Sequence, residues 1–454
     1  MNKLLSKIFK ILPPRLISIF EKVQNSEIGS RIAIGVFWSF LGAVISRGSM
    51  LLAAILVARV LGKEQYGELG MIRSTINMFV VFAGFGLGLT ATKYVAEFRE
   101  SDKIKTGKII GLSTIFAGLS GGLISLIILI FAPYLAENTI NAPHLVLELR
   151  LGAVMLFFSA LNGAQTGVLS GFEAFKAIAR VNLISGVVAF PIQIGFTFMW
   201  GLTGSVIGYG TFFLLIWLLS YFAVRKESKK YNVHINFFNA WSEWEVLYKF
   251  SFPALLSGLL VSPVVWICNA MLVNYPDGFG QMAIFDAANQ WRTIIIFIPT
   301  ILSQIALPLF SSSLNTNDKF NYILKVNIKI NFVISLLVTL IVSIFSVPIM
   351  KLYGSDFEEG WSVLILLALS AVLFSIGNIL GKVLASKGEM WLGFIFNFIW
   401  AVLIIAVSYL LLKEGFGAVG LAVANFISYL LFTIIIYVYI FRTGSKLIKQ
   451  STHG

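Results

Sequence analysis

The sequence predicts an all-α polytopic membrane protein, with twelve transmembrane helices in two pseudo-symmetric six-helix lobes around a central cavity. Three observations lead to this fold class. The 454-residue chain is 58% hydrophobic and only 12% charged, whereas a soluble domain carries about 25% charged residues. Apolar runs of about 20 residues, the length that crosses a bilayer, recur along the chain. Matching residues also recur in its two halves at nearly one offset.

The first 31 residues precede the first apolar run and mix basic with apolar residues. Pro13 and Pro14 interrupt them, and they show neither the long apolar core nor the small-residue cleavage site of a signal peptide. We expect residues 1–31 to form a basic amphipathic segment on the anionic inner leaflet. A plain disordered tail is the alternative.

Twelve apolar runs follow and define the domain organisation. We place the spans at residues 32–58, 67–92, 108–131, 149–171, 180–200, 203–224, 251–273, 281–308, 329–350, 361–381, 390–412 and 418–441. The first six spans predict an N-terminal lobe over residues 32–224, and the last six predict a C-terminal lobe over residues 251–441. We expect residues 225–250 to be a cytoplasmic linker and residues 442–454 a cytoplasmic tail.

The distribution of basic residues predicts the orientation. With the N-terminus placed inside, 26 of the 34 lysine and arginine residues fall in cytoplasmic segments, five fall in outer loops and three fall within spans. Because basic residues are retained on the cytoplasmic side, we expect both termini in the cytoplasm. Topology then accounts for the net charge of +13, so we do not expect nucleic acid as a partner.

The composition excludes several other kinds of function. The single cysteine, Cys268, rules out an internal disulfide and a multi-cysteine metal site. The three histidines lie far apart and outside the predicted spans, so we expect no metal centre. The sequence contains no GxxxxGK[ST] motif, which excludes an ATP motor in this chain. We predict no cofactor. We also predict no enzymatic activity, because no outer loop is large enough to carry catalytic residues.

An internal repeat divides the chain into two equivalent halves. Three short matches recur. Residues 66–69 match 279–282 and residues 204–206 match 417–419, both at an offset of 213, and residues 169–171 with Asn182 match residues 384–386 with Asn397 at an offset of 215. Because each half contains an even number of spans, both halves insert in the same orientation. We expect an axis along the membrane normal to relate them, with a substrate path between them.

The second span carries a charge inside its apolar sequence. Arg73 and Asn77 are four residues apart and share one face of the helix. A charge at this depth costs about 2.5–3.5 kcal/mol on insertion scales, so Arg73 can face an internal cavity that accepts an anion. The alternative is that Arg73 snorkels to the outer surface, since it lies only about 9 Å from the expected helix end.

The repeat favours the cavity, because the polar positions recur in both halves. At the offset of 213, Arg73 corresponds to Asp286 and Asn77 to Gln290. Thr293 extends this polar stripe along the eighth span, with Arg292 beside it. From these patterns we predict substrate-binding roles for Arg47, Arg73, Arg292, Asn77, Asn289 and Gln290, an ion-coupling role for Asp286, and no catalytic or metal-binding residues.

Three stretches of the sequence resemble a known family. They are LVARVLGKEQYGELG after the first span, FGLGLTATKYVAE at the end of the second, and GVLSGFEAFKAIARVNLI between the fourth and fifth. With the twelve spans in two halves, they resemble the polysaccharide transporter family over about residues 30–442. This family contains the Wzx-type flippases for O-antigen and related repeat units, and it belongs to the multidrug/oligosaccharidyl-lipid/polysaccharide exporter superfamily.

The resemblance implies a flippase that moves an undecaprenyl-pyrophosphate-linked oligosaccharide from the cytoplasmic to the periplasmic leaflet of the bacterial inner membrane. It implies a fold similar to that of lipid II flippases, with two lobes around a cationic cavity, and Arg47, Arg73 and Arg292 match the pattern of cavity cations. The implied partners are the lipid-linked oligosaccharide and membrane lipids. Polysaccharide polymerase and chain-length proteins are further candidate partners.

Two other functions stay open at this point. An ion-coupled antiporter for small molecules or drugs of the same superfamily would need acidic residues early in the N-terminal half. The first span instead has Arg47 and no acidic residue, although proton or sodium coupling through Asp286 stays open. A non-transporting scaffold of glycan assembly is the other alternative.

Overall fold

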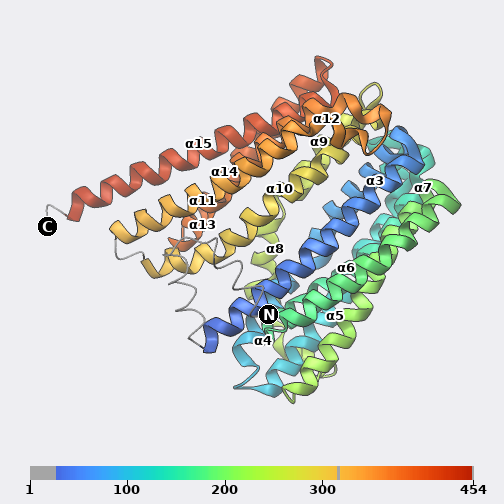
Figure 1. Ribbon diagram of the computed structural model, residues 1–454. Coiled ribbons are helices and arrows are strands. Elements are labelled where there is room, and N and C mark those ends of the chain that lie inside the picture. Colours follow the sequence, from blue (N-terminus) through green and yellow to red (C-terminus); the bar gives the residue numbers. More distant parts are fainter. Residues whose placement is uncertain (1–26, 314–316, 452–454) are drawn as a thin grey trace, which may run out of the picture.

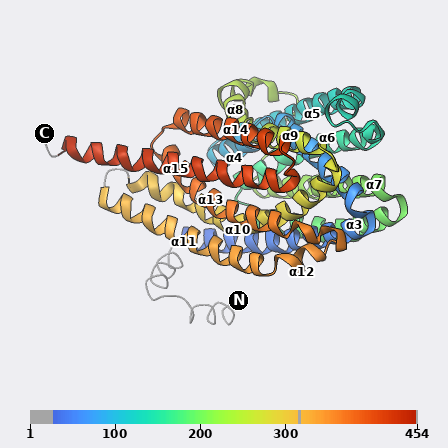
Figure 2. The ribbon, with the colours of Figure 1, turned by 90° about the horizontal axis from the view of Figure 1, so that it is seen from above.

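The computed structural model describes residues 27–313 and 317–451, and in these ranges the chain forms helices and no strand. Figure 1 shows long helices in two groups, which converge at one end of the molecule and diverge toward the other. In the view from above, α11, α13 and α15 extend to the left, and α5, α6 and α7 lie on the right (Figure 2).

The described residues of the N-terminal half form five α-helices, and two of these helices are broken. They are α3 (Glu27–Gly84), α4 (Leu87–Phe98), α5 (Lys103–Tyr134), α6 (Val146–Gly171) and α7 (Phe175–Lys230). A straight helix as long as α3 would measure about 87 Å, far more than the roughly 30 Å of a bilayer core. Glycines with positive φ interrupt the long helices, Gly62 in α3 (φ 75°) and Gly201 in α7 (φ 56°). Each of these helices therefore supplies two spans.

In the C-terminal half, the residues that the structure describes form eight α-helices. They are α8 (Phe252–Gly258), α9 (Val261–Val273), α10 (Gly278–Ser313), α11 (Asn317–Ile344), α12 (Ser346–Lys351), α13 (Trp361–Ser386), α14 (Met390–Lys413) and α15 (Gly417–Ser451). Short 3₁₀ or π turns lie between several helices, at Leu135–Thr139, Pro143–Leu145, Ala240–Glu243, Leu247–Ser251 and Ser355–Gly360.

The helices account for the twelve predicted spans. Nine segments of the described chain are long and apolar enough to cross a membrane. Two of these segments contain the breaks of α3 and α7, and α10 adds another helix of 36 residues. The prediction of an all-α, multi-pass membrane protein is therefore confirmed.

The predicted span at 67–92 is interrupted, which the sequence did not indicate. Phe85 and Gly86 both have positive φ, and they separate α3 from α4. A side chain does not fit at position 86, because a Cβ there would lie 2.6 Å from the carbonyl oxygen of Ser251. Thr90 on α4 also shares a hydrogen bond with the Ser251 hydroxyl, at 2.8 Å. The start of the C-terminal half is therefore anchored on the N-terminal half at this point.

Three other boundaries differ from the prediction. The span placed at 251–273 is divided into α8 and α9, and the span placed at 329–350 ends at Ile344, before the short helix α12. The last helix continues to Ser451, into the predicted tail. The amphipathic segment predicted for residues 1–31 lies, up to residue 26, outside the described residues.

The two halves meet along α3 and α10, which the internal repeat relates. Gly67 permits this contact, because a Cβ at this position would lie 1.8 Å from the carbonyl oxygen of Phe279. Beside it, the fully buried ring of Tyr66 packs against Tyr353 and Phe357, with ring centroids 6.1 and 5.8 Å away. Burial raises the pKa of the Tyr353 phenol well above its ordinary value, so this hydroxyl stays neutral.

Polar contacts reinforce the same end of the interface. Lys63 forms an ion pair with Glu359 at 2.6 Å, and the Arg59 guanidinium donates a hydrogen bond to the Leu352 carbonyl at 2.6 Å. Together with the aromatic cluster, these contacts close the halves on each other at the end where Gly62 breaks α3. We call this the closed end of the interface.

We predict that Gly67→Ala destabilises the protein by roughly 1–3 kcal/mol, the usual cost of overpacking a tight contact. The added methyl group must push α3 and α10 apart, because it meets backbone rather than a movable side chain. The measurement is the thermal unfolding midpoint in detergent, with Gly48→Ala on the same helix as the control, since a Cβ there meets nothing within 4 Å. Equal midpoints for the two variants would contradict the tight contact.

Candidate functional site between the two halves

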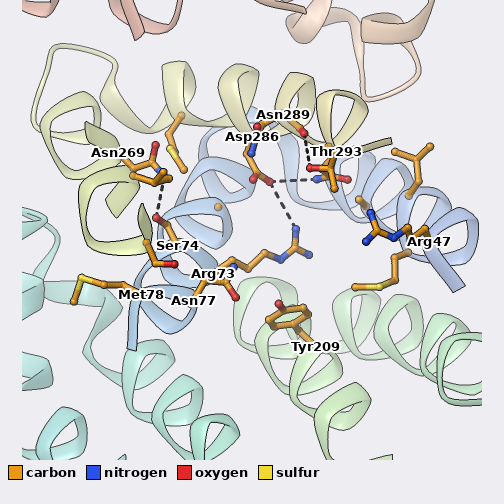
Figure 3. A pocket seen from close by; sticks show the side chains of 18 of the residues that line it. Arg47, Arg73, Ser74, Asn77, Met78, Tyr209, Asn269, Asp286, Asn289 and Thr293 are labelled. Carbon is orange, nitrogen blue, oxygen red and sulfur yellow. Dashed lines mark hydrogen bonds and ion pairs between the residues drawn. The ribbon is translucent and has the colours of Figure 1, made fainter. Parts of the chain in front are cut away.

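A cavity of about 540 Å³ lies between the two halves, and residues of α3, α7, α9 and α10 line it (Figure 3). Polar side chains make up much of its wall: Arg47, Arg73, Ser74, Asn77, Gln193, Tyr209, Ser262, Asn269, Asp286, Asn289, Gln290 and Thr293. Six of the seven residues predicted to be functional are in this set. Both halves of the chain therefore contribute to one chamber.

Arg73 and Asp286 face each other across this chamber. A guanidinium nitrogen of Arg73, on α3, lies 3.8 Å from a carboxylate oxygen of Asp286, on α10, and the two side chains are only 14% and 19% exposed. Gln290, one turn further along α10, donates to the same carboxylate at 3.2 Å and to the Tyr66 hydroxyl at 2.5 Å. Asp286 is therefore held by groups from both halves.

The hydrogen-bonding capacity of Arg73 is only partly used. Its buried Nε makes no hydrogen bond with any described residue, and its guanidinium carbon lies 5.2 Å from the centre of the Tyr209 ring on α7. The 3.8 Å contact with Asp286 is longer than a charge-assisted hydrogen bond, which measures about 2.7–2.9 Å. Arg73 can therefore bind a stronger acceptor that enters the chamber.

Arg47 supplies a second positive charge to the same chamber. It lies on the part of α3 that precedes the break, and Figure 3 places it well to one side of Arg73. Its guanidinium stacks over the Phe297 ring of α10, 4.3 Å from the ring centre. With Asp286 ionised, the two arginines leave the chamber with a net charge of +1.

The predicted amides lie in the chamber as neutral hydrogen-bonding groups. The Asn77 side chain is exposed there and makes no hydrogen bond with any described residue. Asn289 accepts only a long contact from Arg292, at 3.5 Å, and its backbone carbonyl accepts from the Thr293 hydroxyl at 3.0 Å. Donors and acceptors are thus available on both sides of the cavity.

Arg292 is the one predicted site residue that does not line this cavity. It donates to the Ser370 hydroxyl at 3.1 Å and lies over the rings of Phe374 and Tyr429, at 5.7 and 5.2 Å. The reason is helical geometry. Between Asp286 and Arg292 the helix turns by about 600°, so Arg292 points roughly 240° around the helix axis from the face that carries Asp286. Arg292 therefore packs into the C-terminal half.

Several lining residues were not among the predicted site residues. Tyr209 and Gln193, both on α7, reach the cavity, and Ser74 accepts a hydrogen bond from Asn269 at 2.9 Å (Figure 3). The polar side chain of Gln193 inside an apolar span was the available signal. The described residues contain no cluster of three or more His, Cys, Asp or Glu side chains that could hold a metal. The arginine and amide side chains that line the cavity suit an anion with several oxygen atoms.

Solved structures with the same fold are transporters. An inward-facing multidrug resistance MATE family transporter of the MOP superfamily matches with a TM-score of 0.75 and 16% identity, over 89% of this chain and 95% of that one. The lipid II flippase MurJ, in its inward closed conformation, matches with a TM-score of 0.68 and 18% identity, over 88% of this chain and 87% of that one. The chain therefore has the fold of this class of multi-pass membrane proteins.

The family follows from the sequence. Residues 32–314, more than half of the chain, match the family described as polysaccharide biosynthesis protein, and the chain belongs to this family. The EPS I polysaccharide export inner membrane protein EpsE of Ralstonia nicotianae is 27% identical over 189 residues, which are 40% of this chain and 43% of that relative. The match thus spans less than half of the relative's length. The predicted membership of the polysaccharide transporter family is confirmed.

We predict that Arg73 and Asp286 are energetically coupled. Arg73→Ala leaves a carboxylate in a poorly solvated chamber, and Asp286→Ala leaves a guanidinium there, so each single variant should lose more stability than its removed contact explains. Chemical unfolding of both single variants and the double variant should give a coupling free energy of about 0.5–3 kcal/mol. Additive effects would show that the two side chains do not interact.

Proposed function

We propose that this protein moves an undecaprenyl-pyrophosphate-linked oligosaccharide repeat unit from the cytoplasmic to the periplasmic leaflet of the bacterial inner membrane. The observation that carries the proposal is a cationic chamber built from both halves of the chain, with Arg73 incompletely bonded. Membership of the polysaccharide biosynthesis family supports a glycan as the cargo. The name of EpsE supports export across the inner membrane.

The substrate is an anion with a lipid tail, and its two ends need different surroundings. The tail stays in the bilayer while the head group enters the chamber. A planar guanidinium donates two parallel hydrogen bonds to a phosphate, so Arg73 and Arg47 are the groups that bind the pyrophosphate. The phosphate competes with Asp286 for Arg73, and the amides of Asn77, Asn289 and Gln290 face the remaining oxygens.

In the proposed transport cycle, the closed end of the interface opens while the opposite end closes. The chamber then faces one side of the membrane at a time. In the state described here, the aromatic cluster and the Lys63–Glu359 ion pair close the end marked by Gly62. The basic-residue distribution favours a periplasmic position for this end and cytoplasmic termini, and we propose that the chamber opens toward the cytoplasm in this state. When phosphate displaces Asp286 from Arg73, an electrostatic contact that joins α3 to α10 is lost, which favours separation of the closed end.

The membrane potential favours the proposed direction. Moving one charge through 100 mV is worth about 2.3 kcal/mol, so two negative charges leaving an inside-negative cell gain roughly twice that. When no substrate is bound, the potential favours the conformation in which the positively charged chamber faces the cytoplasm. The charges on substrate and protein thus provide a driving force.

An ion-coupled antiporter is the second candidate, and the position of Asp286 favours it. This carboxylate lies in the chamber and is held by Arg73 and Gln290, so a proton or sodium ion that neutralises it would also release Arg73. In that function, transport would respond to an imposed ion gradient and would not need a pyrophosphate head group.

We predict that Arg47→Ala and Arg73→Ala slow flipping by about 10- to 100-fold, because each removes charge-assisted bonds worth roughly 1.5–3 kcal/mol. The assay follows movement of a fluorescent undecaprenyl-pyrophosphate-linked glycan across liposomes that contain the purified protein. Arg150→Ala is the control, since Arg150 is exposed and lies outside the cavity.

The outcome separates the candidate functions. Wild-type rates in both cavity variants would remove the proposal. Movement of a cationic drug, driven by a proton or sodium gradient and lost in Asp286→Asn, would favour the antiporter.

A further inference from the structure

A second cavity, of about 360 Å³, lies within the C-terminal half, between α13, α14 and α15. Of these three helices, α15 packs against both α13 and α14. Residues Leu260 and Val261, at the break between α8 and α9, complete its wall, and Val261 also lines the central cavity. The two cavities are therefore neighbours, separated where the first span of the C-terminal half is broken.

Glycines create this space. Gly381 on α13 and Gly393 on α14 line the cavity, and a Cβ on either would meet nothing within 4 Å. A typical interior is packed without voids larger than a water molecule. Two helices that are consecutive in the chain thus leave a chamber between them because their facing positions lack side chains.

Polar groups line the chamber without partners. Asn378, Lys382, Glu389 and Asn397 all line it, and their side chains form no hydrogen bond or ion pair with any described residue. Trp400 is only 3% exposed, and its indole N–H makes no hydrogen bond with any described residue. A buried N–H without an acceptor costs about 1–3 kcal/mol. A ligand that supplies an acceptor would recover this free energy.

Aromatic rings form the opposite part of the lining. Trp400 lies 5.5 Å from Tyr429, with the rings tilted by 36°, and Phe374 meets Tyr429 edge-on at 5.5 Å. These three rings contribute apolar surface beside the amide, ammonium and carboxylate groups, and the Arg292 guanidinium lies over Phe374 and Tyr429, at 5.7 and 5.2 Å. The chamber therefore combines aromatic faces with hydrogen-bonding groups of both kinds.

We propose that this cavity binds one sugar residue in its ring form. A pyranose packs its C–H face on aromatic rings, and its hydroxyls both donate and accept hydrogen bonds. Carboxylate and amide oxygens accept from those hydroxyls, while the ammonium group and the Trp400 N–H donate to them. A hydrocarbon chain would leave these groups unbonded, and the opposite charges of Lys382 and Glu389 leave no net charge to bind a free anion.

The proposal concerns binding of a sugar and stands apart from transport. Its test uses purified full-length protein in nanodiscs and a panel of free methyl glycosides of glucose, galactose, N-acetylglucosamine and glucuronic acid. Saturation-transfer NMR detects which glycoside binds, and titration gives its affinity. Because the free methyl glycosides carry neither a lipid tail nor a phosphate, their binding is measured independently of flipping, and failure of flipping and failure of sugar binding give different results.

Variants locate the bound sugar in this cavity. Gly393→Leu and Gly381→Leu fill it, while Trp400→Phe keeps a ring and removes the N–H. Gly195→Leu on α7 is the matched control, because a Cβ there also meets nothing within 4 Å and Gly195 lies outside both cavities.

We expect at least one glycoside to bind the wild type and Gly195→Leu equally. Either cavity-filling variant should abolish this binding, and Trp400→Phe should weaken it about two- to tenfold, the effect of one hydrogen bond. The proposal is overturned if no glycoside binds, or if binding persists in the filled variants. Native mass spectrometry that finds a phospholipid retained by the wild type and lost from Gly393→Leu would assign the cavity to lipid, and would also overturn it.

Discussion

The contact between Arg73 and Asp286 is the constraint on which the rest of the interface depends. A guanidinium within a membrane span is costly unless protein groups or water compensate it, and here the compensation comes from the other half of the chain. This places a polar chamber at the interface and requires α3 and α10 to approach closely. Gly67 and the buried ring of Tyr66 make that approach possible.

The internal repeat explains why these two residues meet. Arg73 and Asp286 occupy corresponding positions at the offset of 213, and so do Gly67 and Gly280. Positions close to an axis that relates two halves lie near their own counterparts. One half therefore contributes a cation and the other an anion at the same level of the interface. A ligand that binds only one member of the pair acts directly on how tightly the halves are joined.

The sequence predicted the spans and the polar chamber because both follow from one-dimensional patterns. Apolar runs locate helices, and a stripe at helical spacing locates the face that carries Asp286, Asn289 and Gln290. The same geometry should have excluded Arg292 from that face. Other features depend on contacts distant in the chain. The close approach of Gly86 to the Ser251 carbonyl is one of them. In a helix that is apolar on every side, no pattern shows which residues face a cavity.

The most direct measurement compares two lipids with the same hydrocarbon chain. Undecaprenyl pyrophosphate and undecaprenol differ only in the head group, an anionic pyrophosphate in the first and a neutral hydroxyl in the second, and native mass spectrometry can report the affinity of purified protein for each. We expect wild-type protein to prefer the pyrophosphate at least about tenfold, the value of one charge-assisted contact, and Arg73→Gln to remove this preference. Equal affinities in the wild type, or an unchanged preference in Arg73→Gln, would contradict this expectation.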